Sequence, residues 1–340
     1  MVTAATSRLE GLRGRAIDPG ATTVVLLLLG VAVFLLVGCL QSKNFAQYTI
    51  QGIALGSVYG SLALALVLVY RATHVINFAQ GELAMFTTYI AYELMLHGFS
   101  YWAAFAATLA IAFVLGTVLQ VTIIRPVQHR SVIATVIVTV GLFVLIDGVV
   151  NWVWGGDLKS MKSPFGNGFF VVGGVAIQHL YVGMVIVVFA SAVLVWALFR
   201  FTKLGLGMRA AALRPAAASL VGVRVDSMLA IGWGLAAVLG GVAGLMAEPS
   251  QFLLTPTFMQ PILVYAFAAA VLGGLESPAG ALIGGLLIGV MLTLLVGYEP
   301  HIGPVTITSE LQLPFSFVVL LLILLVKPSG LFGRREVRRV

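Results

Sequence analysis

The residues best suited to chemistry form one short polar cluster, Asn77, Gln80, Gly81 and Glu82, within the segment Val75-Ile-Asn-Phe-Ala-Gln-Gly-Glu82. Almost all of the surrounding chain is apolar. A break in a helix at this point would expose backbone N–H groups and the positive end of a helix dipole, which Glu82 complements and Asn77 can cap. Polar groups inside a bilayer are costly, so they usually mark a path or a partner.

The length of the helix that follows places this cluster below the membrane surface. A helix from Glu82 to Leu96 would be about 22 Å long at about 1.5 Å per residue, whereas the hydrocarbon core is about 30 Å thick. If Leu96 lies at the outer face, Glu82 lies inside the membrane, with Arg71 or the helix N-terminus as its cationic partner. We predict that Asn77, Gln80, Gly81 and Glu82 belong to a substrate pathway; the alternative is a polar knot that only fixes a bend.

The composition indicates an integral membrane protein. The chain has 340 residues, of which 60% are hydrophobic and 9% charged, with a mean hydropathy of +1.09; soluble domains contain about 25% charged residues. We therefore predict an all-α, polytopic transmembrane bundle of about ten spans with one or two broken helices. The predicted spans are 22–40, 47–70, 74–97, 101–124, 131–153, 180–200, 226–248, 259–275, 279–297 and 313–327. Eight or nine spans remain possible, because 313–327 is short and 259–275 is interrupted.

The distribution of basic residues sets the orientation. With a cytoplasmic N-terminal tail over 1–21, the inside segments hold 16 of the 19 lysines and arginines, as the positive-inside rule requires. The transmembrane domain then covers 22–327, and the tail 328–340 is cytoplasmic. The segment 201–225 lies inside and the glycine-rich segment 154–179 lies outside, either as a plain connection or as a docking surface. The net charge of +7 reflects this bias and does not indicate nucleic acid as a partner.

Glycines spaced four apart predict close helix packing rather than ligand binding, because small residues let helices approach each other in lipid. A second interruption, Gly273-Gly-Leu-Glu-Ser-Pro-Ala-Gly280, reads as a tight inner turn with Glu276 among the headgroups; the alternative is a substrate contact. The predicted packing glycines are Gly52, Gly56, Gly60, Gly273, Gly274, Gly280 and Gly284.

The inner segment contains a short alanine-rich helix. Pro215 suits a first helical turn, Ala216 to Leu220 favours helix, and Gly222 would end it. Such a helix between basic flanks suits docking into a partner's groove, although alone it could be a solvated loop.

The sequence has no catalytic constellation and no cofactor motif. No lysine follows a glycine, so a Gly-Lys-Ser/Thr phosphate loop is missing, as are His-Glu-x-x-His and Gly-x-Ser-x-Gly. The single cysteine, Cys39, excludes an intramolecular disulfide. Leu36-Val-Gly-Cys39 resembles a lipoprotein cleavage site, but we favour a first transmembrane helix with an incidental cysteine, because a protein with nine further spans needs no lipid anchor. We expect no enzyme activity, no metal and no cofactor on this chain.

Four blocks of residues resemble the LivH-type permease family of branched-chain amino acid ABC importers. They are Gly52-Ile-Ala-Leu-Gly-Ser-Val-Tyr-Gly60, Ile76-Asn-Phe-Ala-Gln-Gly-Glu82, the segment Gly205 to Gly222, and Ala270-Val-Leu-Gly-Gly274 with the tail Lys327-Pro-Ser-Gly-Leu-Phe-Gly-Arg-Arg-Glu-Val337. The resemblance covers residues 47 to 340. Gln80 stands where the family usually has histidine, and Ala216 where many relatives have an acid. The span 22–40 is not always present in the family.

The resemblance implies a multi-pass protein of the bacterial cytoplasmic (inner) membrane that imports branched-chain amino acids by alternating access. It implies a second, LivM-type permease, two cytoplasmic ATPase subunits that carry ATP and Mg, and an extracytoplasmic substrate-binding protein. The residues it assigns to ATPase coupling are Gly205, Arg209, Ala210, Ala216, Ala217, Ala218, Leu220 and Gly222. Relatives that take amides, urea or aromatic acids leave the substrate open. An ion-driven secondary transporter and a membrane scaffold without transport are the competing hypotheses.

Overall fold

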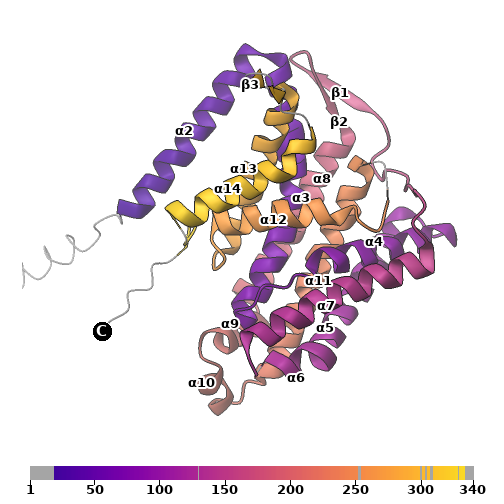
Figure 1. Cartoon of the computed structure of the whole chain (residues 1–340), viewed down its shortest axis with the longest axis vertical. Helices are drawn as coiled ribbons and strands as arrows, with labels where there is room; N and C mark the ends of the chain where they lie inside the picture. Colours follow the sequence, from indigo (N-terminus) through magenta and orange to yellow (C-terminus); the bar gives the residue numbers. More distant parts are fainter. Residues whose placement is uncertain are drawn as a thin grey trace, which may run out of the picture.

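The chain is a helical bundle with two short hairpins (Figure 1). The computed structural model describes residues 19–128, 130–251, 254–298, 301–302, 305–306, 309–327 and 329–333. The helices are α2 (Pro19–Gln41), α3 (Lys43–Thr73), α4 (Gln80–Leu96), α5 (Tyr101–Leu119) with a π-helical turn (Gln120–Ile124), α6 (Arg125–Gln128), α7 (Val132–Trp154), α8 (His179–Phe201), α9 (Lys203–Leu213), α10 (Pro215–Leu220), α11 (Val225–Gln251), α12 (Met259–Gly273), α13 (Pro278–Tyr298), a 3-10 turn (Ser309–Leu311) and α14 (Gln312–Val326). The strands are β1 (Phe169–Val172), β2 (Val175–Gln178), β3 (His301–Ile302) and β4 (Val305–Thr306).

This architecture confirms the predicted class of polytopic helical membrane protein, and each of the ten predicted spans overlaps a helix. The spans are unequal, however. The helices long and apolar enough to cross a membrane are Lys43–Thr73, Tyr101–Gln128, Val132–Trp154, His179–Phe201, Val225–Ser250 and Pro278–Tyr298. Shorter apolar stretches are Met259–Gly273, Gln312–Leu325 and, within the 23-residue α2, Leu28–Gln41; α4 has 17 residues. Six full-length spans are therefore present among the described residues.

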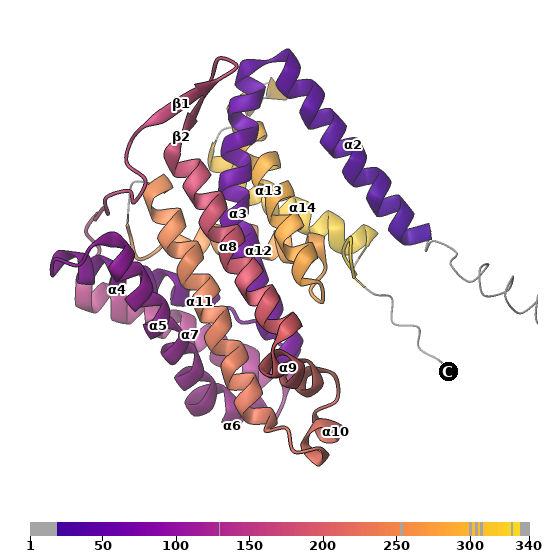
Figure 2. The same ribbon diagram turned by 180° about the vertical axis from the view of Figure 1, so that it is seen from behind.

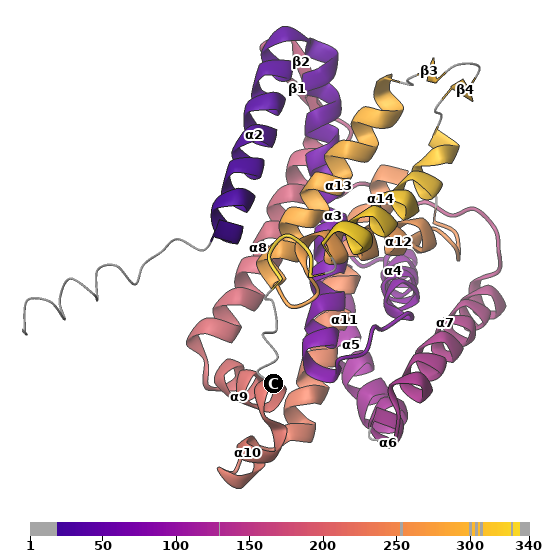
Figure 3. The ribbon, with the colours of Figure 1, turned by 60° about the vertical axis from the view of Figure 1, so that its left-hand side comes forward.

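Helix α3 forms the middle of the bundle, with α13, α11, α12 and α8 packed around it (Figures 1 and 3). Its contact with α13 is made by backbone. A Cβ atom built on Gly285 would lie 2.3 Å from the Cα atom of Gly60, and one on Gly289 would lie 2.2 Å from that of Gly56. Gly52 meets Val290 of α13 in the same way. Glycines at these positions let the two helices touch without side chains between them.

The turn between α12 and α13 is also built from close backbone contacts. Gly274 has a φ of +98°, and a Cβ on Gly273 would lie 2.1 Å from the carbonyl oxygen of Gly280. The tail returns to this turn, where the N–H of Leu331 donates to the carbonyl oxygen of Leu272 at 2.7 Å. Glu276 is exposed in the turn, as expected for a connection and not for a substrate contact.

The segment 154–179 contains structure that the sequence did not suggest. Strands β1 and β2 pair antiparallel around Gly173 and Gly174, whose φ values of +59° and +82° suit a tight hairpin. The N–H of Met161 donates to Glu248 Oε1 of α11 at 2.8 Å, which fastens the segment to the bundle. Figure 2 shows the hairpin at one end of the molecule and α9 and α10 at the opposite end.

Candidate functional site

The expected break separates α3 from α4. His74 closes α3 in the left-handed region (φ 54°, ψ 20°), and its N–H donates to the carbonyl oxygen of Tyr70 at 2.7 Å. Helix α4 starts at Gln80, two residues before the start expected from sequence. Six non-helical residues, 74 to 79, therefore lie between the two helices. Non-helical backbone at membrane depth must be covered by protein or by a water-filled cavity.

Two amide side chains organise this break. Asn77 Oδ1 accepts from the N–H of Ala79 at 3.1 Å, and Asn77 Nδ2 donates to Gln80 Oε1 at 3.1 Å. Gln80 Nε2 in turn donates to the carbonyl oxygen of Ala236 in α11 at 3.0 Å. Asn77 thus shapes the turn before α4 instead of capping the helix itself, whose N-cap is Ala79. The chain of amides ties the break to α11.

Small residues on neighbouring helices make room for this arrangement. A Cβ on Gly240 of α11 would lie 2.7 Å from Gln80 Nε2, and one on Gly244 would lie 2.3 Å from Thr88 Oγ1. Gly81 faces Leu263 of α12: a Cβ built on Gly81 would lie 3.1 Å from the Cβ atom of Leu263. The break is therefore enclosed by α11 on one side and α12 on the other.

Glu82 joins two short helices at their beginnings. Its Oε1 accepts from Gln260 Nε2 at 3.4 Å, while Oε2 is buried without a hydrogen-bond partner among the described residues. Glu82 lies in the first turn of α4, and Gln260 in the first turn of α12. Asp147 of α7 is a second acid in the electrostatic surroundings of Glu82. Arg71, expected as a charge partner, instead lines a cavity between α3 and α8.

The cluster is closed in this conformation. Asn77, Gln80 and Glu82 are 0%, 1% and 1% exposed, and Gly81 is buried. The structure thus brings the four predicted pathway residues together, but it encloses them in protein. Passage of a solute along them requires α4, α11 and α12 to move apart.

The predicted coupling segment forms two helices, α9 and α10, at the end of the molecule opposite the hairpin (Figure 2). Thr202 Oγ1 accepts from the N–H of Gly205 at 3.0 Å and starts α9. Pro215 is the first residue of α10, and Gly222 follows it with a φ of +85°. The short helix expected from Ala216 to Leu220 is present; α9 was not foreseen.

The tip of this segment exposes apolar side chains. Leu213, Leu220 and Val221 are 78%, 88% and 79% exposed, and Ala216, Ala217 and Gly222 are exposed beside them. The remaining expected coupling residues are not exposed at this tip. Gly205 and Ala218 are buried, Ala210 is half-buried, and Arg209 lines the cavity between α3 and α8.

Sequence reasoning missed the partners of the break. Gln260 carries a readable signal, because it is a polar residue at the start of an interrupted apolar span. The carbonyl of Ala236 carries none, because every residue has one. Within the described ranges, no three His, Cys, Asp or Glu residues are placed to hold a metal ion.

Comparison with known proteins gives a consistent result. Residues 48–325 match the family described as "Branched-chain amino acid transport system / permease component". The chain is 30% identical over 314 residues to the high-affinity branched-chain amino acid transport system permease protein LivH of Escherichia coli, covering 88% of this chain and 99% of LivH. It is 28% identical over 311 residues to BraD of Pseudomonas aeruginosa, covering 87% of this chain and 98% of BraD. PsaBC from Streptococcus pneumoniae aligns over 88% of this chain and 98% of that chain with a TM-score of 0.45 and 15% identity, which is too distant to carry an argument.

Proposed function

This chain belongs to the family of permease components of branched-chain amino acid transport systems, and on that premise we propose that it is the membrane-spanning subunit of an ATP-driven importer. Its solutes are leucine, isoleucine, valine or related amino acids, which cross by alternating access. ATP and Mg bind to separate ATPase subunits. We expect this chain itself to carry no nucleotide, no metal and no catalytic residue.

The observation that carries the proposal is the exposed apolar tip formed by Leu213, Leu220 and Val221. Large apolar side chains gathered at an exposed helical tip indicate a protein interaction site. The sequence has no phosphate loop, so ATP hydrolysis that drives transport has to take place on another chain. A helix that docks into an ATPase groove supplies that connection.

The break is suited to a zwitterionic solute. The positive ends of α4 and α12 face the same polar cluster, and helix N-termini favour carboxylates. Glu82 complements these dipoles and is bound by Gln260, so we assign it as a pin for the broken helix. Asn77 and the free backbone groups are then nearest the solute.

We assign the partner subunits to opposite ends of the molecule. A second, LivM-type permease completes the membrane domain, and two ATPases bind the α9–α10 side. A substrate-binding protein docks at the hairpin within 154–179. The protein lies in the bacterial cytoplasmic membrane with both termini inside.

Uptake by the full complex in proteoliposomes tests this function. We expect radiolabelled leucine to enter only when ATP and Mg are present on the ATPase side and the binding protein is on the other. Unlabelled amino acids, amides, urea and aromatic acids added as competitors would define the substrate class.

Two results would contradict the proposed function. Uptake driven by a proton or sodium gradient without ATP would establish the secondary transporter, with Glu82 as its coupling acid. ATP-driven uptake of a labelled amide or of urea, with no uptake of labelled leucine, isoleucine or valine, would reject the substrate class but leave the importer.

A further inference from the structure

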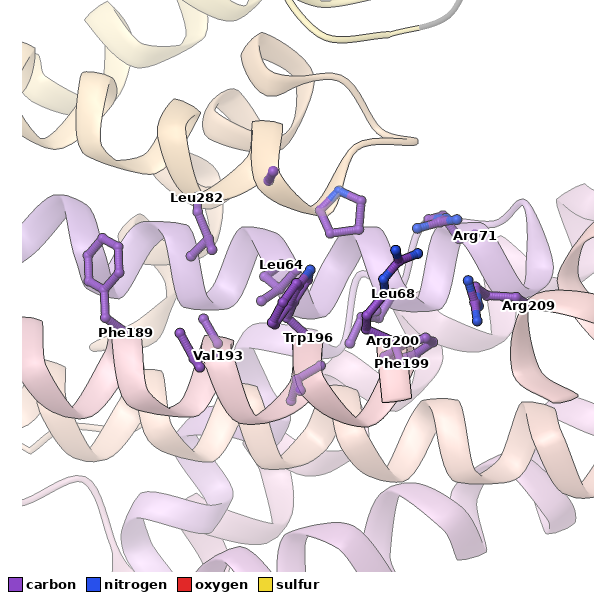
Figure 4. A pocket seen from close by; sticks show the side chains of 14 residues that line it. Leu64, Leu68, Arg71, Phe189, Val193, Trp196, Phe199, Arg200, Arg209 and Leu282 are labelled. Carbon is purple, nitrogen blue, oxygen red and sulfur yellow. The ribbon is translucent and has the colours of Figure 1, made fainter. Parts of the chain in front are cut away.

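A groove on the outside of the bundle has no role in the proposed function. It lies between α3, α8 and α13, near the start of α9, and has a volume of about 360 Å³. Figure 4 shows the side chains that line it, with Phe189 at one end and Arg71, Arg200 and Arg209 together at the other. We call it the basic groove.

The length of the basic groove corresponds to one leaflet of a bilayer. Phe189, Val193, Trp196 and Arg200 follow one face of α8 at helical spacing. The 11 residue-to-residue steps from Phe189 to Arg200 span about 17 Å at about 1.5 Å each. Half of the hydrocarbon core is about 15 Å. The arginines thus reach one membrane surface while Phe189 lies near the middle.

The wall of the groove is exposed and is not covered by another described helix of this chain. Val193 and Trp196 are 56% and 59% exposed, and only 22% of the apolar window of α8 is buried. Leu64, Leu68 and Leu282 supply the rest of the apolar floor. An acyl chain can lie against such a surface.

The end of the groove opposite Phe189 is strongly cationic. Three of its 14 lining residues are arginines, and the described lining contains no acidic side chain. Arg71 also interacts with other groups of this chain, so the charge argument depends on Arg200 and Arg209. Guanidinium groups bind phosphate oxygens in a bidentate fashion. By the distribution of basic residues, this end lies on the cytoplasmic side.

From this geometry we propose that the basic groove binds an anionic glycerophospholipid of the cytoplasmic leaflet. The phosphate is held by Arg200 and Arg209, and one acyl chain lies along α8 toward Phe189. Basic pockets between transmembrane helices on the cytoplasmic side are suited to anionic headgroups. The proposal places Arg209 with the lipid and removes it from the surface that meets the ATPase.

Native mass spectrometry of the purified complex tests the headgroup. The protein is delipidated and titrated with dioleoyl phosphatidylglycerol or with dioleoyl phosphatidylcholine. We expect tighter binding of phosphatidylglycerol, weakened about fivefold by Arg200→Gln and about 30-fold by Arg200→Gln with Arg209→Gln. The matched control, Arg130→Gln with Arg224→Gln, removes the same charge from exposed cytoplasmic-side arginines outside the groove. Binding within twofold of the wild type is expected there.

A second pair of variants tests the apolar part. Val193→Trp fills the groove and is expected to reduce binding of both lipids. Leu194→Trp is the control, because Leu194 is 71% exposed and lies outside the groove lining. Equal loss in the two arginine double variants, or equal affinity for the two lipids in the wild type, would overturn the proposal.

A photo-crosslinker distinguishes lipid from protein as the occupant. p-Benzoylphenylalanine in place of Trp196, a groove-lining residue of similar size that is 59% exposed, should yield lipid adducts in the assembled transporter in native membranes. A dominant adduct with another subunit would show that a protein covers the groove, and would overturn the proposal while leaving the transport function untouched.

Discussion

Two regions of this molecule place their side chains in opposite ways. The break from Asn77 to Glu82 is polar and fully enclosed, and its amides are bonded to one another and to α11. The tip at α9 and α10 is largely apolar and exposed, with Leu220 at 88%. Exposing the apolar tip is unfavourable for an isolated chain, whereas hydrogen bonds compensate the burial of the amides in the break. In the break, Glu82 Oε2 is buried without a partner among the described residues.

The difference indicates what each region meets. Polar groups held inside the bundle can serve a polar solute that enters when helices separate. We propose that the apolar groups outside the bundle meet a partner that covers them. Substitutions in the two regions should therefore have different effects. Those in the break should lower the stability of the protein, and those at the tip should weaken its assembly with partners.

The largest expected effect on stability is at Gly244, where α11 meets α4. An added Cβ would lie 2.3 Å from Thr88 Oγ1 and 2.7 Å from the backbone carbonyl oxygen of Ala84. Because backbone cannot yield easily, we expect Gly244→Ala to cost about 3 kcal/mol, at the upper end for overpacking. Thermal unfolding in detergent measures it.

Gly232 is the matched control on the same helix. The nearest atom to an added Cβ there is Met208 Cε at 3.5 Å, which is ordinary contact. Gly232→Ala should be neutral or stabilising, since alanine favours helix. Equal destabilisation by both variants would mean that α11 rejects any side chain and that contact with α4 is not special.

A somewhat smaller loss is expected for Gln80→Leu. The change leaves Asn77 Nδ2 and the carbonyl oxygen of Ala236 buried without their present partner. We expect a cost of about 2 kcal/mol, since each unsatisfied buried group costs about 1–3 kcal/mol. The same unfolding assay reports it.

Gln80→His provides the comparison. One histidine tautomer can accept from Asn77 and donate to Ala236, so stability should stay close to that of the wild type. A loss as large as that of Gln80→Leu would contradict the hydrogen-bonded role assigned to this position.

The smallest effect is expected at the tip. Leu220 is 88% exposed, so Leu220→Ser should change the stability of the isolated chain by less than about 0.5 kcal/mol. Unfolding of the subunit without its ATPases measures this. A loss of 2 kcal/mol would show that Leu220 packs within the chain and is not a docking residue.

Sequence predicted the helical class and the position of the break because both depend on local patterns. Apolar runs of the right length identify spans, and Asn77, Gln80 and Glu82 stand out within them. The glycines of α3 recur every four residues, so their common helix face can also be seen in the sequence. The short helix at Ala216 follows from Pro215 and Gly222, which have simple conformational roles.

The missing parts depend on the tertiary arrangement. Gln260 reaches Glu82 across 178 positions of sequence, and Gln80 reaches a carbonyl group 156 positions away. No local pattern identifies such pairs. The basic groove was missed for the same reason, since Arg71, Arg200 and Arg209 come from three helices. The hairpin in 154–179 was not predicted, because a glycine-rich sequence is equally typical of a plain connecting loop.

The most direct measurement compares Leu220→Glu with Asn77→Ala in the complete transporter, recording ATPase assembly and ATP-driven leucine uptake in each. We predict that Leu220→Glu inserts normally but weakens ATPase binding at least tenfold and loses uptake, because a charge is buried in an apolar contact. Asn77→Ala should be less stable, because Ala79 N–H and Gln80 Oε1 lose a buried partner, but it should bind the ATPases as tightly as the wild type while losing uptake. Normal assembly and uptake in Leu220→Glu, or failed assembly in Asn77→Ala, would contradict the division of roles between the enclosed break and the exposed tip.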